Sequence, residues 1–258
     1  MRYYCCGMIR SGSTWQYNIV KEILSRKRQV TSIGFLSKEE ELIPILQTQD
    51  NFIVKFHFAS MAVISDVQRG TGKAFYIHRQ LEDIAVSYMK MKQKDLPWVL
   101  DSNLLRNAWK TYKIWTAHPE VLVQRYEDSV KEPLKTIRQI AQYLEISLTD
   151  EEITYIEKKY NIESQKKFIA GMPGSSPREK LIRKYRRKIG GIAYHVIGKQ
   201  RTRRLASVFR KLRNETIDQN RLLHNEHINT GEVDFWKKAL NRKDQEHLSA
   251  YLRKLTSG

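Results

Sequence analysis

Three short stretches combine residue types that could grip an anion or move a proton. The first, GMIRSGSTWQYN at residues 7–18, lies between a predicted strand and a predicted helix. Backbone N–H groups of such a turn and of the first helical turn point to one place, where the helix dipole favours negative charge. Gly12 lets the backbone approach closely, and Arg10 adds a fixed positive charge. Further hydroxyl donors come from Ser11, Ser13 and Thr14. The alternative is an ordinary tight turn with Ser13 as the helix N-cap.

The second stretch, FYIHRQLEDIAVSYMK at residues 75–90, pairs an arginine with a serine eight residues later. Arg79 ends a predicted strand and Ser87 lies on the helix that follows. These two side chains can converge on a second anion. A surface arginine and a mid-helix serine are the alternative interpretation.

The third stretch, FIVKFHFAS at residues 52–60, places Lys55 and His57 on the same side of a strand near its end. Ligands of α/β folds bind at such strand ends. A neutral imidazole can take a proton from an attacking hydroxyl near pH 7, and a neighbouring ammonium can stabilise charge on the transferred group. The other six histidines are expected to be structural.

The elements that position these stretches alternate in the first half of the chain. Strands are predicted at Arg2–Gly7, Phe52–Phe58, Ala74–His78 and Val121–Arg125. Helices are predicted at Thr14–Arg26, Lys38–Gln49, Ala59–Arg69, Asp83–Lys92, Asn103–His118, Glu132–Leu144 and Thr149–Tyr160. This order predicts an α/β fold with a central, mainly parallel sheet flanked by helices and a mostly helical C-terminal half.

A basic segment follows the Gly/Pro/Ser cluster AGMPGSSPRE at residues 170–179. Residues 171–226 contain fifteen Lys/Arg against four acids, which contributes +11 of the net charge of +18. We expect one domain over residues 1–258 with a basic helical insertion or lid at about 171–226. Its residues 178–213 could contact an anionic substrate or a membrane surface, or form a solvated face on packed helices.

Bulk properties fit a globular protein with an anionic partner. The 258 residues are 41% hydrophobic, and the net charge of +18 favours a nucleotide, nucleic acid, an anionic sugar or a lipid headgroup. The only two cysteines, Cys5 and Cys6, are adjacent and predict a reducing compartment. No run of about eighteen apolar residues predicts a membrane span, and no secretion signal is visible. A cytoplasmic protein is expected, in peripheral contact with a membrane if the basic segment binds one.

Taken together, the three stretches resemble the sulfotransferases that use 3′-phosphoadenosine 5′-phosphosulfate (PAPS). That family has a PKSGTTW-like loop, where this sequence reads IRSGSTW, and an R…S pair eight residues apart, where it reads HRQLEDIAVSY. The resemblance implies a P-loop-like three-layer fold. It implies that Arg10 through Thr14 hold the 5′-phosphosulfate, that Trp15 stacks on adenine, and that Arg79 and Ser87 hold the 3′-phosphate. It also implies that His57 is the general base and Lys55 a cation that stabilises the sulfuryl group.

Two later stretches extend the resemblance. The stretch RYED resembles the family's YEDL junction, and this resemblance implies that Tyr126 lies near the adenine. The stretch NTGEVDFWK resembles the family's RKG…GDWK segment, which implies that Gly231 lies near the 3′-phosphate. Asn229 and Thr230 stand where cytosolic members have Arg and Lys, and Arg10 replaces a lysine. Asn241 and Arg242 occupy the Thr-Val positions of a dimer motif, so the oligomeric state stays open.

The sequence therefore predicts an enzyme that transfers a sulfuryl group from PAPS to an acceptor hydroxyl, or less readily an amine, and releases adenosine 3′,5′-bisphosphate (PAP). No metal and no nucleic acid are expected. Two alternatives remain: a nucleotide-dependent kinase, although G-K-[ST] is missing, and a non-catalytic polyanion or nucleic-acid binder. The acceptor is not specified.

Overall fold

The computed structural model describes residues 1–47, 51–172, 217–218, 220–224 and 231–257. The chain divides into two compact units, one made of Met1–Tyr160 and Thr230–Gly258 and the other of Asn161–Asn229. All the candidate site residues lie in the first unit. Most of the basic segment lies outside the described residues, as do Asn229 and Thr230, so the single domain with an insertion stays a prediction.

A five-stranded sheet forms the centre of the first unit. Strand β1 (Arg2–Gly7) lies between β3 (Phe52–Phe56) and β4 (Gly72–His78). The order is β2-β3-β1-β4-β5, with β2 (Thr31–Phe35) and β5 (Leu122–Arg125) at the edges, and every neighbouring pair is parallel. The predicted α/β class is confirmed. The three inner strands are largely apolar because helices bury both faces of the sheet.

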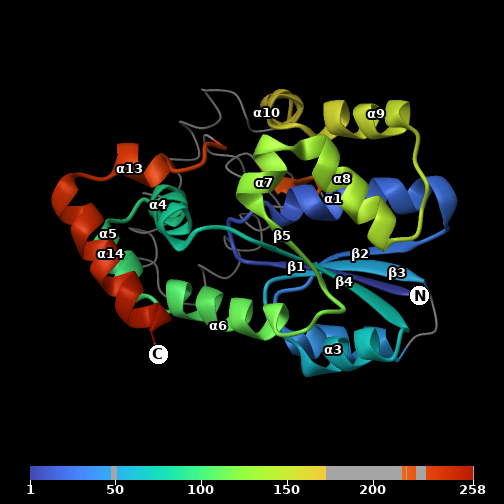
Figure 1. Ribbon diagram of the computed structural model, residues 1–258, viewed down its shortest axis with the longest axis horizontal. Coiled ribbons are helices and arrows are strands. Elements are labelled where there is room, and N and C mark those ends of the chain that lie inside the picture. Colours follow the sequence, from blue (N-terminus) through green and yellow to red (C-terminus); the bar gives the residue numbers. More distant parts are fainter. Residues whose placement is uncertain (48–50, 173–216, 219, 225–230, 258) are drawn as a thin grey trace, which may run out of the picture. The chain divides into compact units, whose positions relative to one another are not determined.

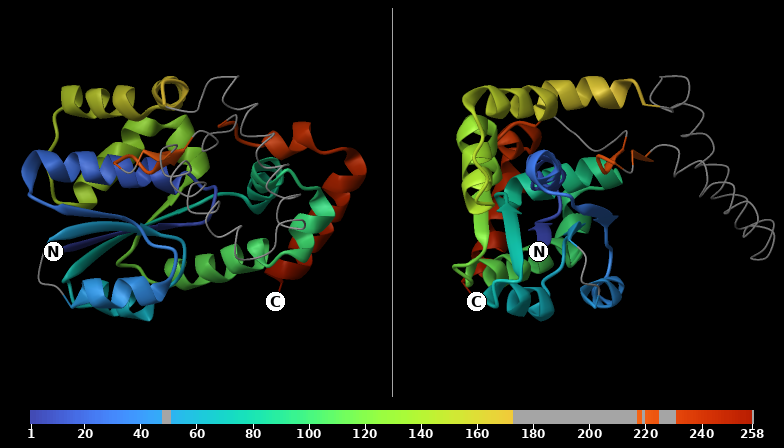
Figure 2. Two further views of the ribbon diagram at one scale, coloured as in Figure 1. Left: turned by 180° about the vertical axis from the view of Figure 1, so that it is seen from behind. Right: turned by 90° about the vertical axis from the view of Figure 1, so that its right-hand side faces the viewer.

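Helices cover the sheet on both faces (Figure 1). Helix α1 (Ser13–Lys27) and α8 (Pro133–Tyr143) lie on one face, and α3 (Met61–Gln68) and α6 (Leu104–Thr116) on the other. The same layers are visible from behind (Figure 2). On the α6 face Trp115 packs on Tyr76 and Phe56, with ring centroids 6.1 and 6.4 Å apart.

A group of helices packs together beyond the carboxyl ends of the strands (Figure 1): α4 (Leu81–Lys92), α5 (Leu96–Asp101), α13 (Phe235–Ala239) and α14 (Arg242–Thr256). The first unit also contains α7 (Tyr126–Lys131) and α9 (Asp150–Tyr160). In the second unit the structure describes α10 (Ile162–Ala170) and an antiparallel pair, β6 (Ile217–Asp218) and β7 (Leu223–His224). No described helix is long and apolar enough to cross a membrane.

The predicted strands and most predicted helices are present with ends that differ by at most two residues. The helix predicted at Lys38–Gln49 is present in part: a 3-10 turn η1 (Glu39–Glu41) leads into a short α2 (Leu42–Leu46), and residues 48–49 lie outside the described residues. Pro44 explains the break, because a continuous helix would need it to donate a hydrogen bond to Glu40. Strand β2 was not predicted, since TSIGF is a short, mostly exposed edge strand with only two apolar residues.

Candidate active site

The loop between β1 and α1 owes its shape to two residues with positive φ, Arg10 at 67° and Gly12 at 85°. Gly12, and not Ser13, is the N-cap of α1. A Cβ atom on Gly12 would lie 2.8 Å from Cδ2 of Tyr126, so no larger residue fits without a shift. The first N–H groups of α1 have no acceptor within the helix, and its first turn carries no acidic side chain. The loop therefore presents donors and positive potential to an anion.

The hydroxyl groups of the loop have different surroundings. Ser11 Oγ lies 2.6 Å from the carbonyl oxygen of Met8 and 2.9 Å from that of Ile77, and its N–H donates to Met8 as well. Ser11 is buried, so in this structure its hydroxyl stabilises the loop. Ser13 and Thr14 are also buried, and Trp15 is half-buried. Their predicted contacts with a ligand stay predictions.

Lys55 and His57 come together at the carboxyl end of β3, as strand alternation predicts. Lys55 Nζ lies 3.3 Å from His57 Nε2, and His57 Nδ1 lies 2.7 Å from the carbonyl oxygen of Gly7, the last residue of β1. A carbonyl oxygen only accepts, so Nδ1 carries the proton and Nε2 presents its lone pair. This arrangement prepares Nε2 to accept a proton.

Burial sets the protonation of this pair. The pKa of His57 is lowered to about 3, mainly by burial and then by the positive charges of Lys55 and Arg10, while the hydrogen bond to Gly7 raises it in part. Burial also lowers the pKa of Lys55 to about 8. Near neutral pH the imidazole is therefore neutral and most of the lysine is charged. An anion bound beside them would raise both pKa values.

An aromatic side chain from the edge strand β2 lies against the pair. The ring centroid of Phe35 is 5.4 Å from that of His57, and Lys55 Nζ is 4.7 Å from the Phe35 centroid. Phe35 is 46% exposed. Because β2 was not predicted, Phe35 was missed too. Its ring places apolar surface directly beside His57.

A second group of polar residues joins the loop to α4. Arg10 Nε donates to Ser87 Oγ at 2.9 Å, which links the loop to the helix that follows β4. Burial lowers the pKa of Arg10, and the charge of Arg79 lowers it further, so the two guanidinium groups repel each other. Arg79 Cζ lies 4.3 Å from the ring centroid of Tyr126. The structure thus gathers these predicted residues, with Arg10 as the link between them.

Residues Gly231–Trp236, here called the C-terminal segment, are tied to this group. Arg79 Nη2 donates to the carbonyl oxygen of Glu232 at 2.6 Å and to Asp83 Oδ2 at 2.9 Å. Tyr126 donates its hydroxyl hydrogen to the carbonyl oxygen of Gly231 at 3.0 Å, and the Trp236 N–H donates to Asp83 Oδ1 at 3.0 Å. The buried Asp83 organises the group but was not predicted; its position one helical turn after Arg79 is the signal that could have found it.

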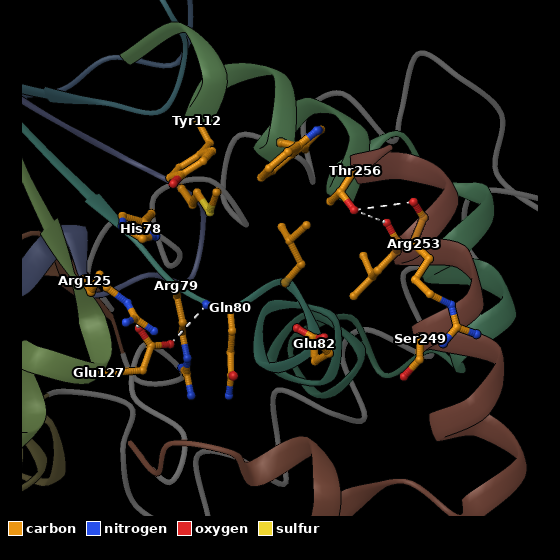
Figure 3. A pocket seen from close by; sticks show the side chains of 14 residues that line it. His78, Arg79, Gln80, Glu82, Tyr112, Arg125, Glu127, Ser249, Arg253 and Thr256 are labelled. Atoms are coloured by element: carbon orange, nitrogen blue, oxygen red, sulfur yellow. Dashed lines mark hydrogen bonds and ion pairs between the residues drawn. The ribbon is translucent and has the colours of Figure 1, made fainter. Parts of the chain in front are cut away.

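A cavity of about 660 Å³ lies beside the carboxyl ends of β4 and β5 (Figure 3). Its lining includes Tyr112 of α6 and Arg253 of α14, and it shares Arg79 with the second group. Lys55 and His57 do not line it. The cavity is therefore separate from the Lys55–His57 pair.

The described residues offer no group of three or more His, Cys, Asp or Glu side chains that could hold a metal ion. Their arrangement is of another class: an α/β fold with a Gly/Ser-rich loop after its central strand β1 and a histidine–lysine pair at the carboxyl end of the neighbouring strand β3. Residues 4–190 match the family model of the sulfotransferase domain. The chain belongs to the sulfotransferase family.

Solved structures share this fold. Mouse sulfotransferase SULT7A1 complexed with PAP aligns with a TM-score of 0.66 and 13% identity, over 98% of this chain and 82% of that chain. Retinol dehydratase in a complex with retinol and PAP aligns with a TM-score of 0.61 and 16% identity, over 98% of this chain and 80% of that chain. No curated protein matches the sequence.

Proposed function

We propose that this protein transfers a sulfuryl group from PAPS to an acceptor hydroxyl, with His57 as the general base. The observation that carries the proposal is the Gly7–His57–Lys55 arrangement, in which a neutral imidazole with an unprotonated Nε2 adjoins a buried ammonium. The family supports the reaction class. The structural neighbours named above contain PAP, which is what PAPS becomes after losing its sulfuryl group.

The chain's own residues suit a donor with two anionic ends. The backbone of the loop and Ser13 and Thr14 would bind the 5′-phosphosulfate, while Arg79 and Ser87 would bind the 3′-phosphate, with Gly231 nearby. The aromatic rings of Trp15 and Tyr126 would contact the adenine. The fit rests on charge: the first turn of α1 carries no acid, and no described residue forms an ion pair with Arg10.

The reaction would follow from the geometry of the reacting pair. The acceptor oxygen forms a bond to sulfur while the bond from sulfur to the 5′-phosphate oxygen breaks, and the proton of the acceptor passes to His57 Nε2. At rest, Lys55 donates to that same nitrogen. Lys55 must therefore turn to the sulfuryl oxygens as charge develops on them, which frees the lone pair of Nε2 at the step that needs it. The negative donor also raises the pKa of His57 and makes it a better base.

Phe35 indicates the nature of the acceptor. Its half-exposed ring adjoins both His57 and Lys55, so the carbon skeleton beside the reacting hydroxyl would pack on an aromatic surface. We therefore favour a phenol or an alcohol on an apolar skeleton. Contact of the basic segment 178–213 with an anionic acceptor or a membrane, like a cytoplasmic location, stays a proposal.

Sulfur-labelled PAPS tests the reaction directly. The protein is incubated with the label and a panel of phenols, steroids, lipids and saccharides, and products are separated by chromatography. We expect label on an apolar hydroxyl compound. A parallel panel with γ-labelled ATP and Mg²⁺ covers the kinase alternative. Transfer of label from ATP with none from PAPS would contradict the proposal. It would also be contradicted if neither donor gave a labelled product while the protein bound polyanions.

A further inference from the structure

We propose that the cavity beside the carboxyl ends of β4 and β5 is a second binding site, which takes a small planar aromatic anion such as an aryl carboxylate. Its volume of about 660 Å³ lies within the usual range of small-molecule sites. Lys55 and His57 do not line it, so the reaction proposed above leaves the cavity unused. The inference does not depend on the proposed function.

Aromatic rings form one wall of this cavity. Trp109 and Tyr112, one turn apart on α6, stack with ring centroids 5.1 Å apart and 17° between their planes. The ring of His78 meets Tyr112 edge-on at 4.9 Å. The pKa of His78 is lowered to about 4, mainly by burial, so this ring is uncharged near neutral pH. A planar ring of a ligand would pack against such a wall. The apolar side chains of the lining are Met8, Leu81 and Leu252.

One face of α14 forms another wall. Its lining residues are spaced three, one and three positions apart, as residues on one side of a helix are: Ser249, Leu252, Arg253 and Thr256. In Figure 3 this face lies across the cavity from Tyr112 and His78. Arg253 is exposed and forms no ion pair with any described residue. Its guanidinium is therefore available to an anion at the edge of the cavity.

Some hydrogen-bonding groups of the lining lack partners. Arg79 Nε and Trp109 Nε1 are buried donors without an acceptor among the described residues, and Arg79 as a whole is only 8% exposed. One buried acceptor, Glu127 Oε2, also lacks a hydrogen bond, but it lies 3.8 Å from Arg125 Nε in an ion pair. Buried polar groups are almost always paired, so the unpaired donors favour a ligand that supplies acceptor oxygens.

The charges of the lining favour the same kind of ligand. Three arginines, Arg79, Arg125 and Arg253, face two acids, Glu82 and Glu127. The excess of one positive charge favours an anion over a cation. An aromatic ring that carries one carboxylate therefore matches the aromatic wall, the unpaired donors and the net charge.

Two probes of the same shape test the site, 1-naphthoate and its uncharged counterpart 1-naphthamide. Saturation-transfer difference NMR gives the Kd of each, with and without millimolar PAP. We expect 1-naphthoate to bind about fivefold or more tightly than the amide, since hydrogen bonds to charged groups are the stronger ones. Arg253→Met should weaken 1-naphthoate about fivefold and the amide less than about twofold. Ser249→Trp, which fills the cavity, should abolish the binding of both probes.

Two control variants locate the probe. Lys254→Met removes a positive charge from the next residue of α14, which is exposed and does not line the cavity, and should leave both affinities unchanged. Phe35→Ala, beside the proposed reaction site, should leave them unchanged as well. Thermal unfolding checks that Ser249→Trp is folded. Arg253→Met alters an exposed side chain, so it tests the site even if the larger substitution does not fold.

Three results would overturn the inference. The first is that neither probe binds, or that both bind equally well. The second is that PAP displaces 1-naphthoate, which would put the probe in the nucleotide site. The third is a loss of affinity in Phe35→Ala or Lys254→Met as large as that in Arg253→Met. Failure of PAP to bind, with 1-naphthoate still bound as expected, would contradict the proposed function and leave this inference standing.

Discussion

The two ends of the proposed nucleotide site are built in different ways. The reacting end consists of Gly7, Lys55 and His57, which lie on or just beyond two neighbouring parallel strands whose register pairs Cys5 with Lys55. The other end joins Arg10 to Ser87 across 77 residues and Arg79 to Glu232 across 153 residues. The first end is thus built on paired central strands, and the second on contacts between segments distant in the sequence. Mutations at the two ends should therefore have different consequences.

The largest effect is expected at the reacting end. His57→Ala should lower turnover by about 10²- to 10⁴-fold, the usual contribution of a general base, and leave PAP affinity within about threefold. Steady-state kinetics with a productive acceptor and PAP titration measure the two quantities. His247→Ala, which changes an exposed histidine of α14, is the control. Near-normal turnover in His57→Ala would remove His57 from the mechanism.

The next largest effect is expected at the recognition end, and on stability. Asp83→Ala leaves Arg79 buried without its carboxylate and should lower the free energy of unfolding by about 3 kcal/mol. PAP affinity should fall as well, because the C-terminal segment loses the acceptor of Trp236. Urea unfolding measures the first effect.

Asp150→Ala is a matched control for Asp83→Ala, since its ion pair with Arg138 has the same 2.9 Å distance but is exposed. It should change stability little. If both variants lose equal stability, the buried group is not what organises this end.

A smaller effect is expected where the two ends meet. Gly12→Ala should cost about 1–3 kcal/mol, from an unfavourable backbone conformation at φ of 85° and from the close contact with Tyr126. Gly70→Ala shares a positive φ of 73° but has no atom within 4 Å of the added Cβ, so it should show the backbone cost alone. Thermal unfolding compares them, and equal losses would argue against the tight Gly12–Tyr126 contact.

The smallest effect concerns pH and the reacting end. In the free protein Lys55 has a pKa of about 8 and is charged below it, so kcat/KM for PAPS, which reports the free protein, should fall as the pH rises through about 8. No loss is expected between pH 7 and 5, because His57, with a pKa of about 3, stays neutral there. Lys55→Arg should move the alkaline decline above pH 9, since arginine keeps its charge. If kcat/KM of Lys55→Arg still declined near pH 8, the decline would have to come from the titration of another group.

The same contrast explains what the sequence could predict. The apolar inner strands and the spacing of Lys55 and His57 are local patterns, and the structure has both. The roles of Asp83 and Glu232 depend on tertiary contacts. Asp83 accepts from the Trp236 N–H, and the Glu232 carbonyl oxygen accepts from Arg79; each bond spans 153 residues, so no local pattern encodes it. Strand β2 was not predicted because two apolar residues in a short, mostly exposed strand give too weak a pattern, and Phe35 was missed with it. The contact of Arg10 with Ser87 joins residues 77 apart in the sequence, which residue type alone does not reveal.

The most direct test of the central claim is calorimetric titration of the wild-type protein with PAP, supported by thermal unfolding. We predict a defined binding isotherm and a stabilisation of about 2.7 kcal/mol at a PAP concentration one hundred times its Kd, with weaker binding of adenosine 5′-monophosphate. ATP with Mg²⁺ should stabilise the protein less than PAP. The absence of heat and of any shift in Tm with millimolar PAP, together with a clear shift with ATP and Mg²⁺, would contradict the account.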